Sequence, residues 1–522
     1  MTDPSTAMDH ETKRQSTATT TVLTFLGVFS GALLAFGITI YLGHQVGEDG
    51  TGQFFQIVAF FSIAITLATF GADTGLVRNL AAQKAVGATK YLGSTLTVAG
   101  VPAVVLALLL GIALWMSAES LETRLGVAGL AGTIRVMAPL LVPATIMNLA
   151  FGALRGLGRV ATFSALQNIL LPALRFSAVV VAVAVGGTMI QLAAAWSFPT
   201  ALAALLACVV TWQTLRRIRH GKDEFTADSD GLPSAKVSFR GFWGFSSARG
   251  ASALVETMLE WIDVIAVAVF LGPAAAGIYG AVNRCVRLGV MLEHTARLVT
   301  GPMLSACLAV GNRQGAKQLF GDTAKLLVFC AWPFYLTLAI FAPAVLSLFG
   351  PGFAAGALPL AIISLVMMLV VSAGGVQSLL LMAGKSRWQL GNKTCALLAA
   401  LVLNLWLVPA WGLLGAVTAW SVAVLVDCLL ATIQVSRAMG FGAPLRQMLP
   451  LAATSLLLFG VAGIVWRVVF GPSLLALGLQ LATAVPLYLF LSLKFRRRLG
   501  LEKVVDGIRA SRIIAKLHPA EN

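Results

Sequence analysis

Charged side chains inside long apolar segments are the residues of this sequence with the clearest capacity for chemistry. The densest group lies in the apolar segment 242–271, where Arg249, Glu256, Glu260 and Asp263 are separated by 7, 4 and 3 positions. At about 100° per residue, an α-helix would place all four within a sector of roughly 60°. Because an ionisable group is costly in lipid, such a stripe is expected to face a polar interior.

The next apolar segment, 274–300, adds Arg284 and Arg287 on one helical face. Counted from the turn between the two segments, Asp263 would lie about as deep as Arg284, and Glu256 about as deep as Arg287. Two interpretations follow: ion pairs that lock a helical hairpin, or a cavity that contacts a ligand or ions. Buried ion pairs are poor stabilisers, which favours the cavity. Three more ionisable residues stand alone in other apolar segments, namely Arg135, Arg175 and Asp427.

The elements that must position these charges are membrane helices. The chain has 522 residues and a mean hydropathy of +0.88, with 58% hydrophobic and 11% charged residues. Soluble proteins carry about 25% charged residues, so a water-soluble enzyme is excluded. A spanning helix needs about 20 apolar residues. The sequence therefore predicts an all-α polytopic membrane protein with about fourteen transmembrane helices.

The polar segments divide this chain into expected parts. No part outside the lipid reaches the roughly 50 residues that a small domain requires. The parts are a cytoplasmic N-terminal tail at 1–19, a first six-helix lobe at 20–215, a basic cytoplasmic linker at 216–241, a second six-helix lobe at 242–438, two further helices at 439–494 and a basic cytoplasmic tail at 495–522.

Basic residues indicate the orientation of the chain. Of the 37 Lys and Arg residues, 29 fall in segments that this arrangement places in the cytoplasm, and the outer loops hold Arg124 alone. Cytoplasmic loops are enriched in Lys and Arg. The distribution therefore predicts an even number of spans with both termini in the cytoplasm.

Local resemblances at nearly constant offsets suggest an internal duplication. Their offsets are 229, 228 and 224 residues: Leu42-Gly43 with Leu271-Gly272, Gly156 with Gly384, and Ala195-Trp196 with Ala419-Trp420. Two pseudo-symmetric six-helix lobes of equal orientation would surround a central cavity. That arrangement suits alternating access.

The other motifs have structural interpretations and indicate no further functional site. Gly384-Lys385-Ser386 lacks the earlier glycine of a phosphate-binding loop, because position 379 is Leu, so no ATPase site is expected. Gly27-xxx-Gly31 and Gly152-xxx-Gly156 predict close helix packing. The six cysteines show no CxxC pair, and we expect no disulfide framework, no metal site and no cofactor.

Several motifs resemble those of bacterial polysaccharide flippases. They are Gly71-Ala72-Asp73-Thr74-Gly75-Leu76, Asp263-Val264-Ile265 followed by Phe270-Leu271-Gly272-Pro273, Leu348-Phe349-Gly350-Pro351-Gly352-Phe353, and Asn404 through Pro409 to Ala416. The resemblance covers roughly residues 20–490 and is typical of the broad multidrug/oligosaccharidyl-lipid/polysaccharide (MOP) exporter superfamily. The absence of Lys and Arg from Thr21 to Tyr41 counts against its lipid II flippase branch.

The resemblance implies a transporter that flips a polyprenyl-diphosphate-linked oligosaccharide to the outer leaflet for cell-surface polysaccharide biosynthesis. A guanidinium can bond two phosphate oxygens at once. Substrate binding is therefore expected at Arg135, Arg175, Arg249, Arg284 and Arg287. Ion coupling or cavity salt bridges are expected at Glu256, Glu260, Asp263 and Asp427.

The expected partners are the lipid-linked glycan, membrane lipids, a coupling cation such as H⁺ or Na⁺, and polysaccharide polymerases or glycosyltransferases, with no nucleic acid. The expected location is the bacterial cytoplasmic membrane, and no enzymatic activity is expected. Two alternatives stay open: an ion-coupled multidrug exporter of the same fold, and a membrane glycosyltransferase or ligase of the same pathway. The first would need a cavity rich in carboxylates and aromatic residues, and the second a sizeable outer loop with acidic residues.

Overall fold

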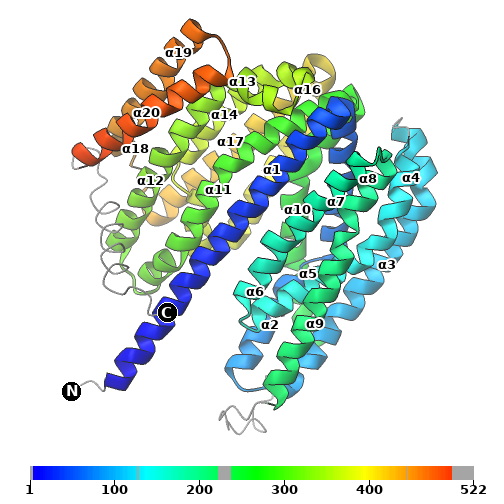
Figure 1. Ribbon diagram of the computed structural model, residues 1–522. Helices are drawn as coiled ribbons and strands as arrows, with labels where there is room; N and C mark the ends of the chain where they lie inside the picture. The colour runs from blue at the N-terminus through cyan, green and yellow to red at the C-terminus, as the bar shows by residue number, and fades with distance from the viewer. Residues whose placement is uncertain (1–3, 126–128, 221–236, 443, 497–522) are drawn as a thin grey trace, which may run out of the picture. The chain divides into compact units, whose positions relative to one another are not determined.

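The computed structural model describes residues 4–125, 129–220, 237–442 and 444–496. Helices make up nearly all of these residues, and no strand occurs among them (Figure 1). Within the described part, 11 helical segments are long and apolar enough to cross a membrane. The all-α membrane architecture expected from composition is therefore confirmed.

The chain forms two compact units. Unit 1 comprises the described residues up to Val46 and those from Gly50 to Trp261, and unit 2 comprises Gly47–Asp49 and the described residues from Ile262 onward. Inside each unit the long helices run side by side (Figure 1).

Unit 1 contains the following elements, in chain order: α1 (Pro4–Thr69), α2 (Ala72–Ala85), η1 (Thr89–Tyr91), α3 (Leu92–Leu125), α4 (Leu130–Met137), η2 (Ala138–Leu140), α5 (Leu141–Gly156), α6 (Val160–Ser164), the π-helical segment η3 (Ala165–Leu170), α7 (Leu171–Ala184), α8 (Met189–Ser197), α9 (Pro199–His220) and the first part of α10 (Phe239–Leu271).

Unit 2 contains the rest of α10, then α11 (Pro273–Ala309), α12 (Arg313–Ile340), α13 (Ala342–Leu346), η5 (Ser347–Phe349), η6 (Pro351–Gly356), α14 (Ala357–Ser372), α15 (Val376–Met382), α16 (Ser386–Trp411), α17 (Leu413–Met439), α18 (Leu445–Ser455), the π-helical segment η7 (Leu456–Val461), α19 (Ala462–Phe470) and α20 (Leu474–Lys494).

The helices are compatible with fourteen spans. α1 holds two of the expected helices, because its backbone leaves the helical region at Gly47, whose φ of 66° suits glycine. α10 and α11 are long enough to span but are not among the 11 apolar segments, because they carry the charged residues. α1 begins at Pro4, well before residue 20. Most of the expected linker, at 221–236, and nearly all of the C-terminal tail lie outside the described residues.

Glycines allow the helices of unit 1 to approach closely. A Cβ atom at Gly31 would lie 2.6 Å from the Asn168 carbonyl oxygen, and one at Gly152 would lie 2.5 Å from that of Asp73. These distances are too short for any side chain. The two Gly-xxx-Gly motifs thus pack helices together, as predicted.

The first part of α10 packs on the junction between α1 and α2. This junction is strained, because Phe70 has a φ of 40° and is followed by Gly71 with a φ of 75°. A Cβ at Gly71 would overlap the carbonyl oxygen of Ser246, and one at Gly250 would overlap Phe70. The close approach explains why α10 divides between the two units, inside the helix rather than at the preceding linker.

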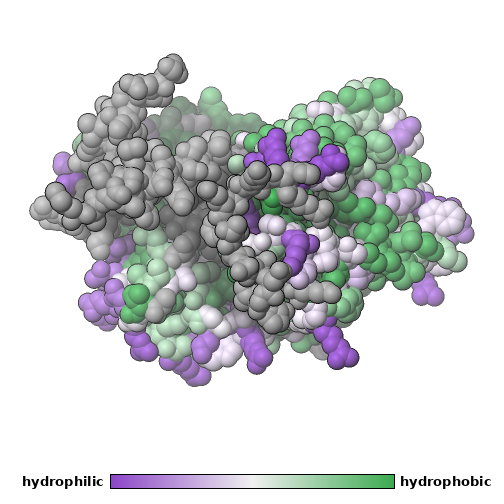
Figure 2. All heavy atoms as spheres, turned by 90° about the horizontal axis from the view of Figure 1, so that it is seen from below, coloured by the Kyte–Doolittle hydropathy of each residue, from purple (hydrophilic) through white to green (hydrophobic). Residues whose placement is uncertain are grey.

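The surface has the character of a membrane protein. Large hydrophobic side chains are exposed along α3, including Val101, Val105 and Leu109. Figure 2 looks onto the end at which α9 finishes, where hydrophilic residues gather at several places and hydrophobic residues cover much of the flank. Exposed apolar flanks are expected where helices contact lipid.

Candidate functional site

The nine predicted site residues divide between the two units. Arg135, Arg175, Arg249, Glu256 and Glu260 belong to unit 1, and Asp263, Arg284, Arg287 and Asp427 belong to unit 2. Their surroundings differ from one residue to the next.

Arg175 is a half-buried cation of unit 1. It lies in the first half of α7, where its Nη2 donates to Oγ1 of Thr200 over 3.1 Å. Its guanidinium lies 3.9 Å from the ring centroid of Trp196, a cation–π distance. Its Nε is buried without a hydrogen-bond partner, and no carboxylate pairs with it in the described part of the chain. A buried N–H and an unneutralised charge together favour an anionic ligand.

Trp196 is held in place by aromatic side chains of α1. Its ring makes edge contacts with Phe54 and Phe61, at centroid distances of 6.2 and 5.9 Å. Since Trp196 itself lies under the guanidinium, these contacts fix the position of Arg175 indirectly. The cation therefore sits on a rigid support formed by α1, α7, α8 and α9.

Asp263 is a buried carboxylate in unit 2. Only 1% of its surface is exposed, and its Oδ1 accepts a hydrogen bond from Nδ2 of Asn404 over 2.6 Å. Asn404, on α16, also donates to the carbonyl of Ala400. The hydrogen-bond partner of the carboxylate is thus an amide of α16.

An amide and a phenol lie beside this carboxylate. Oδ1 of Asn404 is buried and has no hydrogen-bond partner among the described residues. Tyr279 interacts with Asp263 and with Asn283. A carboxylate beside an uncommitted amide oxygen and a phenol oxygen has the donor chemistry of a site for a hard cation or a proton.

Asp427, on α17, has a different environment. Its Oδ2 lies 3.9 Å from Nζ of Lys393 on α16, and its backbone carbonyl accepts from Gln377. Asn392, next to Lys393, and Gln434, about two turns beyond Asp427, exchange two amide hydrogen bonds of 2.8 Å. This network joins α15, α16 and α17, which is typical of a salt bridge that stabilises helix packing.

Arg135 is exposed at one end of unit 1. Its Nη2 lies 2.6 Å from Oε1 of Glu119, and its guanidinium lies 5.5 Å from the ring centroid of Trp115. The two charged side chains are 42% and 76% exposed, so the pair is well solvated. Arg135 is thus neutralised by a neighbour, whereas Arg175 is not.

The remaining charges lie along α10 and α11. Arg249 and Glu260 are exposed and Glu256 is half-buried in the first part of α10, while Arg284 and Arg287 are half-buried on α11. The helical stripe expected from the spacing is thus formed, with its last member, Asp263, buried in unit 2. Substrate binding by these residues stays a prediction.

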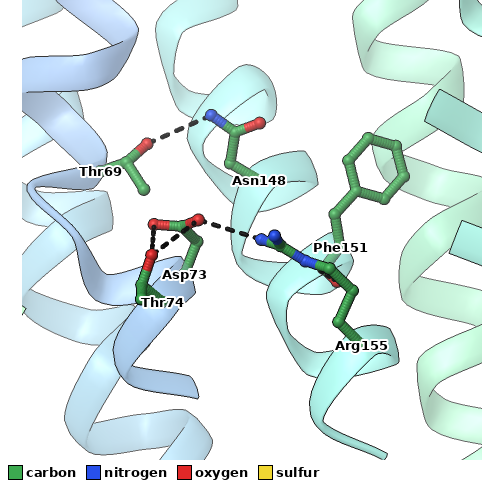
Figure 3. Close-up of polar contacts among 6 residues, drawn as sticks. All are labelled: Thr69, Asp73, Thr74, Asn148, Phe151 and Arg155. Atoms are coloured by element: carbon green, nitrogen blue, oxygen red, sulfur yellow. Dashed lines mark hydrogen bonds and ion pairs between the residues drawn. The ribbon is translucent and has the colours of Figure 1, made fainter. Parts of the chain in front are cut away.

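A polar cluster that sequence reasoning did not select lies between α2 and α5 (Figure 3). Oδ2 of Asp73 lies 3.0 Å from Nη2 of Arg155, and the side chains point toward each other from the two helices. Asn148 donates to Thr69 nearby over 3.4 Å. The guanidinium of Arg155 also lies 4.9 Å from the ring centroid of Phe163. Both charges are partly exposed and neutralise each other, which indicates a structural role.

Asn404 is the most informative residue that was not selected as a site. It is the only strongly polar side chain between Thr394 and Pro409, and that isolation was the available signal. Thr200 had no comparable signal, since a threonine can bond its own helix backbone in any span. Its role became visible only through its contact with Arg175.

Comparisons with known proteins agree with this architecture. The sequence matches the family described as "Polysaccharide biosynthesis protein" over residues 18–307, and no curated protein matches it. Among solved structures, the lipid II flippase MurJ in an inward closed conformation is 13% identical, with a TM-score of 0.70, covering 92% of this chain and 99% of MurJ.

Two transporters of the MOP superfamily are also similar in fold. An inward-facing multidrug resistance MATE family transporter is 17% identical, with a TM-score of 0.57 and coverage of 79% and 96% of the two chains. A transporter from Pyrococcus furiosus is 16% identical, with a TM-score of 0.51 and coverage of 81% and 96%. Since the family match covers more than half of the chain, this protein belongs to the polysaccharide biosynthesis protein family and has the fold of MOP-superfamily flippases and transporters.

Proposed function

We propose that this protein flips a lipid-linked oligosaccharide, joined to a polyprenyl chain through a diphosphate, from the cytoplasmic to the outer leaflet by alternating access. The observation that carries the proposal is Arg175. It is a cation near the middle of a span, with a buried Nε lacking a partner and no neutralising carboxylate among the described residues. A diphosphate supplies the charge and the acceptors that this guanidinium lacks.

Arg249, Arg284 and Arg287 are also proposed to bind the diphosphate. Arg284 and Arg287 stand three positions apart on α11, so they lie on one face of that helix. Arg135 is left outside the proposed site, because Glu119 already neutralises it. Passage of the diphosphate through a low-dielectric interior is the costly step of flipping, and arginines that replace its hydration lower that cost.

Asp263 is the proposed coupling residue. In unit 2 it is buried and bonded to Asn404, with the unpartnered Oδ1 of Asn404 and the hydroxyl of Tyr279 beside it. Binding of H⁺ or Na⁺ there would be linked to the conformation of α10 and α16. A membrane potential of 100 mV supplies about 2.3 kcal/mol per charge moved, which is enough to bias alternating access. Glu256 and Glu260 are proposed to pair with arginines when no substrate is bound.

The proposal places the protein in the bacterial cytoplasmic membrane with both termini in the cytoplasm. It assigns no catalytic reaction and no cofactor. The polysaccharide polymerase or glycosyltransferases of the same pathway are the proposed functional partners. The family match supports this setting, because its description refers to polysaccharide biosynthesis.

The direct test uses the purified full-length protein in liposomes with a fluorescent undecaprenyl-diphosphate oligosaccharide and an external glycosidase. We expect protein-dependent transfer between leaflets, and its loss in Arg284→Ala and Arg175→Ala. Arg135→Ala is the matched control and should transfer at the wild-type rate. Normal transfer by both Arg284→Ala and Arg175→Ala would overturn the proposed site.

Multidrug export is the second candidate function. The observation that favours it is the surplus of carboxylates on α10, where Glu256, Glu260 and Asp263 accompany Arg249 and Arg240. Gradient-driven uptake of a cationic dye into the same liposomes, together with no oligosaccharide transfer, would establish this function instead. The carboxylates would then form the ligand site.

A further inference from the structure

Unit 1 contains a cavity that none of the proposed transport residues lines. Its volume is about 230 Å³, and it lies between the second half of α1, α3, α4 and the start of α5. We define it as the apolar chamber. Fourteen of its fifteen lining residues are hydrophobic, and Thr133 is the exception. Representative members are Ala64, Leu114 and Ile134.

A second cavity of about 220 Å³ adjoins the apolar chamber, and we define it as the polar chamber. The two share the lining residues Ile57, Leu130 and Thr133, so they lie side by side. Gln53, Gln56 and Thr188 contribute polar side chains to the second cavity, and none of its lining residues is charged. The combined space is therefore amphipathic.

Gln56 supplies a hydrogen-bond donor to this space. The residue is 3% exposed, and its Nε2 is buried with no partner among the described residues. An amide N–H buried without an acceptor costs about 1–3 kcal/mol. Since Gln56 lines the polar chamber, an acceptor atom of a bound ligand would remove that cost.

The dimensions match one leaflet of a bilayer. Along α1, the apolar chamber extends from Ile57 to Leu67, which corresponds to about 15 Å of helix. Half of the hydrocarbon core of a membrane is also about 15 Å. In the orientation of the proposed function, on which this step rests, the polar chamber lies at the outer end, beside the turns at Gly129 and Thr188.

We propose that this amphipathic space binds one acyl chain of a glycerolipid from the outer leaflet, with an ester carbonyl accepting from Gln56. An apolar cavity excludes water, and hydrocarbon chains are what the membrane offers to fill it. α3 exposes Val105 and Leu109 toward the surrounding lipid. Neutral amide and hydroxyl groups suit an ester, whereas a polyprenyl diphosphate would require cations in the polar chamber.

The test is photocrosslinking of the purified full-length protein in nanodiscs. The probes are a diester phosphatidylethanolamine with a chain-terminal diazirine and its diether analogue, which lacks the ester carbonyls. We expect crosslinks on α3 and α4, near Leu114 and Ile134, and an excess of diester over diether of about fivefold, the factor of one neutral hydrogen bond.

Three variants decide the outcome. Ala64→Phe fills the apolar chamber and should abolish these crosslinks, whereas Leu109→Phe, on the exposed face of α3, should leave them unchanged. Gln56→Leu should keep the crosslinks but remove the preference for the diester. Thermal unfolding of each variant verifies folding.

Undiminished crosslinks in Ala64→Phe would overturn the proposal, as would displacement of the glycerolipid by an equimolar polyprenyl-phosphate probe. The crosslinking signal involves no translocation. If the protein binds the glycerolipid but transfers no oligosaccharide, the proposed function is contradicted and the proposed lipid site is not.

Discussion

The two units hold solitary charges of opposite sign, a half-buried cation in unit 1 and a buried carboxylate in unit 2. Unit 1 surrounds Arg175 with a hydroxyl and an indole ring, and unit 2 surrounds Asp263 with an amide and a phenol. Neither charge has a partner of opposite sign among the described residues of its own unit. A solitary cation in one unit and a solitary carboxylate in the other suit the proposed transporter, which would couple an anion to a cation.

Other charges inside each unit form pairs. Asp73 with Arg155 in unit 1 and Lys393 with Asp427 in unit 2 neutralise each other across neighbouring helices. A paired charge stabilises packing weakly, whereas a solitary charge within a span is costly and is a candidate for ligand binding. The comparison therefore separates the proposed binding residues from the structural ones.

The largest effect is expected from the solitary cation. Arg175→Ala should lower oligosaccharide translocation about 100-fold, because each charged hydrogen bond contributes roughly 1.5–3 kcal/mol. Arg175→Lys should lower it about tenfold, since a lysine keeps the charge but not the planar fork. Initial rates in liposomes measure both. Equal losses in the two variants would show that packing on Trp196, and not phosphate binding, is the role of this residue.

Asp263→Asn should have the next largest effect. Removal of the charge should abolish the dependence of translocation on an applied H⁺ or Na⁺ gradient. Under a gradient of 100 mV, the translocation rate should therefore fall about tenfold. A loss of this size is within the driving force that such a gradient supplies per charge. Translocation without a gradient should persist. The matched control is Asp427→Asn, which alters a paired carboxylate of the same unit and should leave the gradient dependence intact.

Asp73 and Arg155 provide a test of the charges that form pairs. Because both side chains are partly exposed, a double-mutant cycle of Asp73→Asn and Arg155→Gln should give a coupling of at most about 1 kcal/mol in thermal unfolding. Translocation should stay within about twofold of wild type. A loss as large as that of Arg175→Ala would remove the distinction between paired and solitary charges in unit 1.

The smallest effect is expected at the surface pair. Arg135→Ala and Glu119→Gln should each change stability by less than about 0.5 kcal/mol, because solvated ion pairs contribute little. Rates in liposomes should match wild type at low and high salt. A salt-dependent loss of translocation in Arg135→Ala would show that Arg135 belongs to the substrate site.

The sequence predicted more of the fold than of the site. Runs of apolar residues, Gly-xxx-Gly spacing and the charge stripe of 242–271 are local patterns, and the structure shows the corresponding helices and close contacts. The site depends on which side chains from distant segments meet. Asp263 and Asn404 are 141 residues apart, and Arg175 and Thr200 are 25 apart, so spacing could not pair them.

The sequence by itself determined that this chain is a helical membrane protein, because lipid requires every backbone group to bond within a helix and apolar length limits each span. It also determined which charges are costly. Only the tertiary structure decided which of them are neutralised. Arg135 and Asp427 found oppositely charged neighbours, and Arg175 and Asp263 found neutral ones, because packing sets the few ångströms over which a charge is compensated.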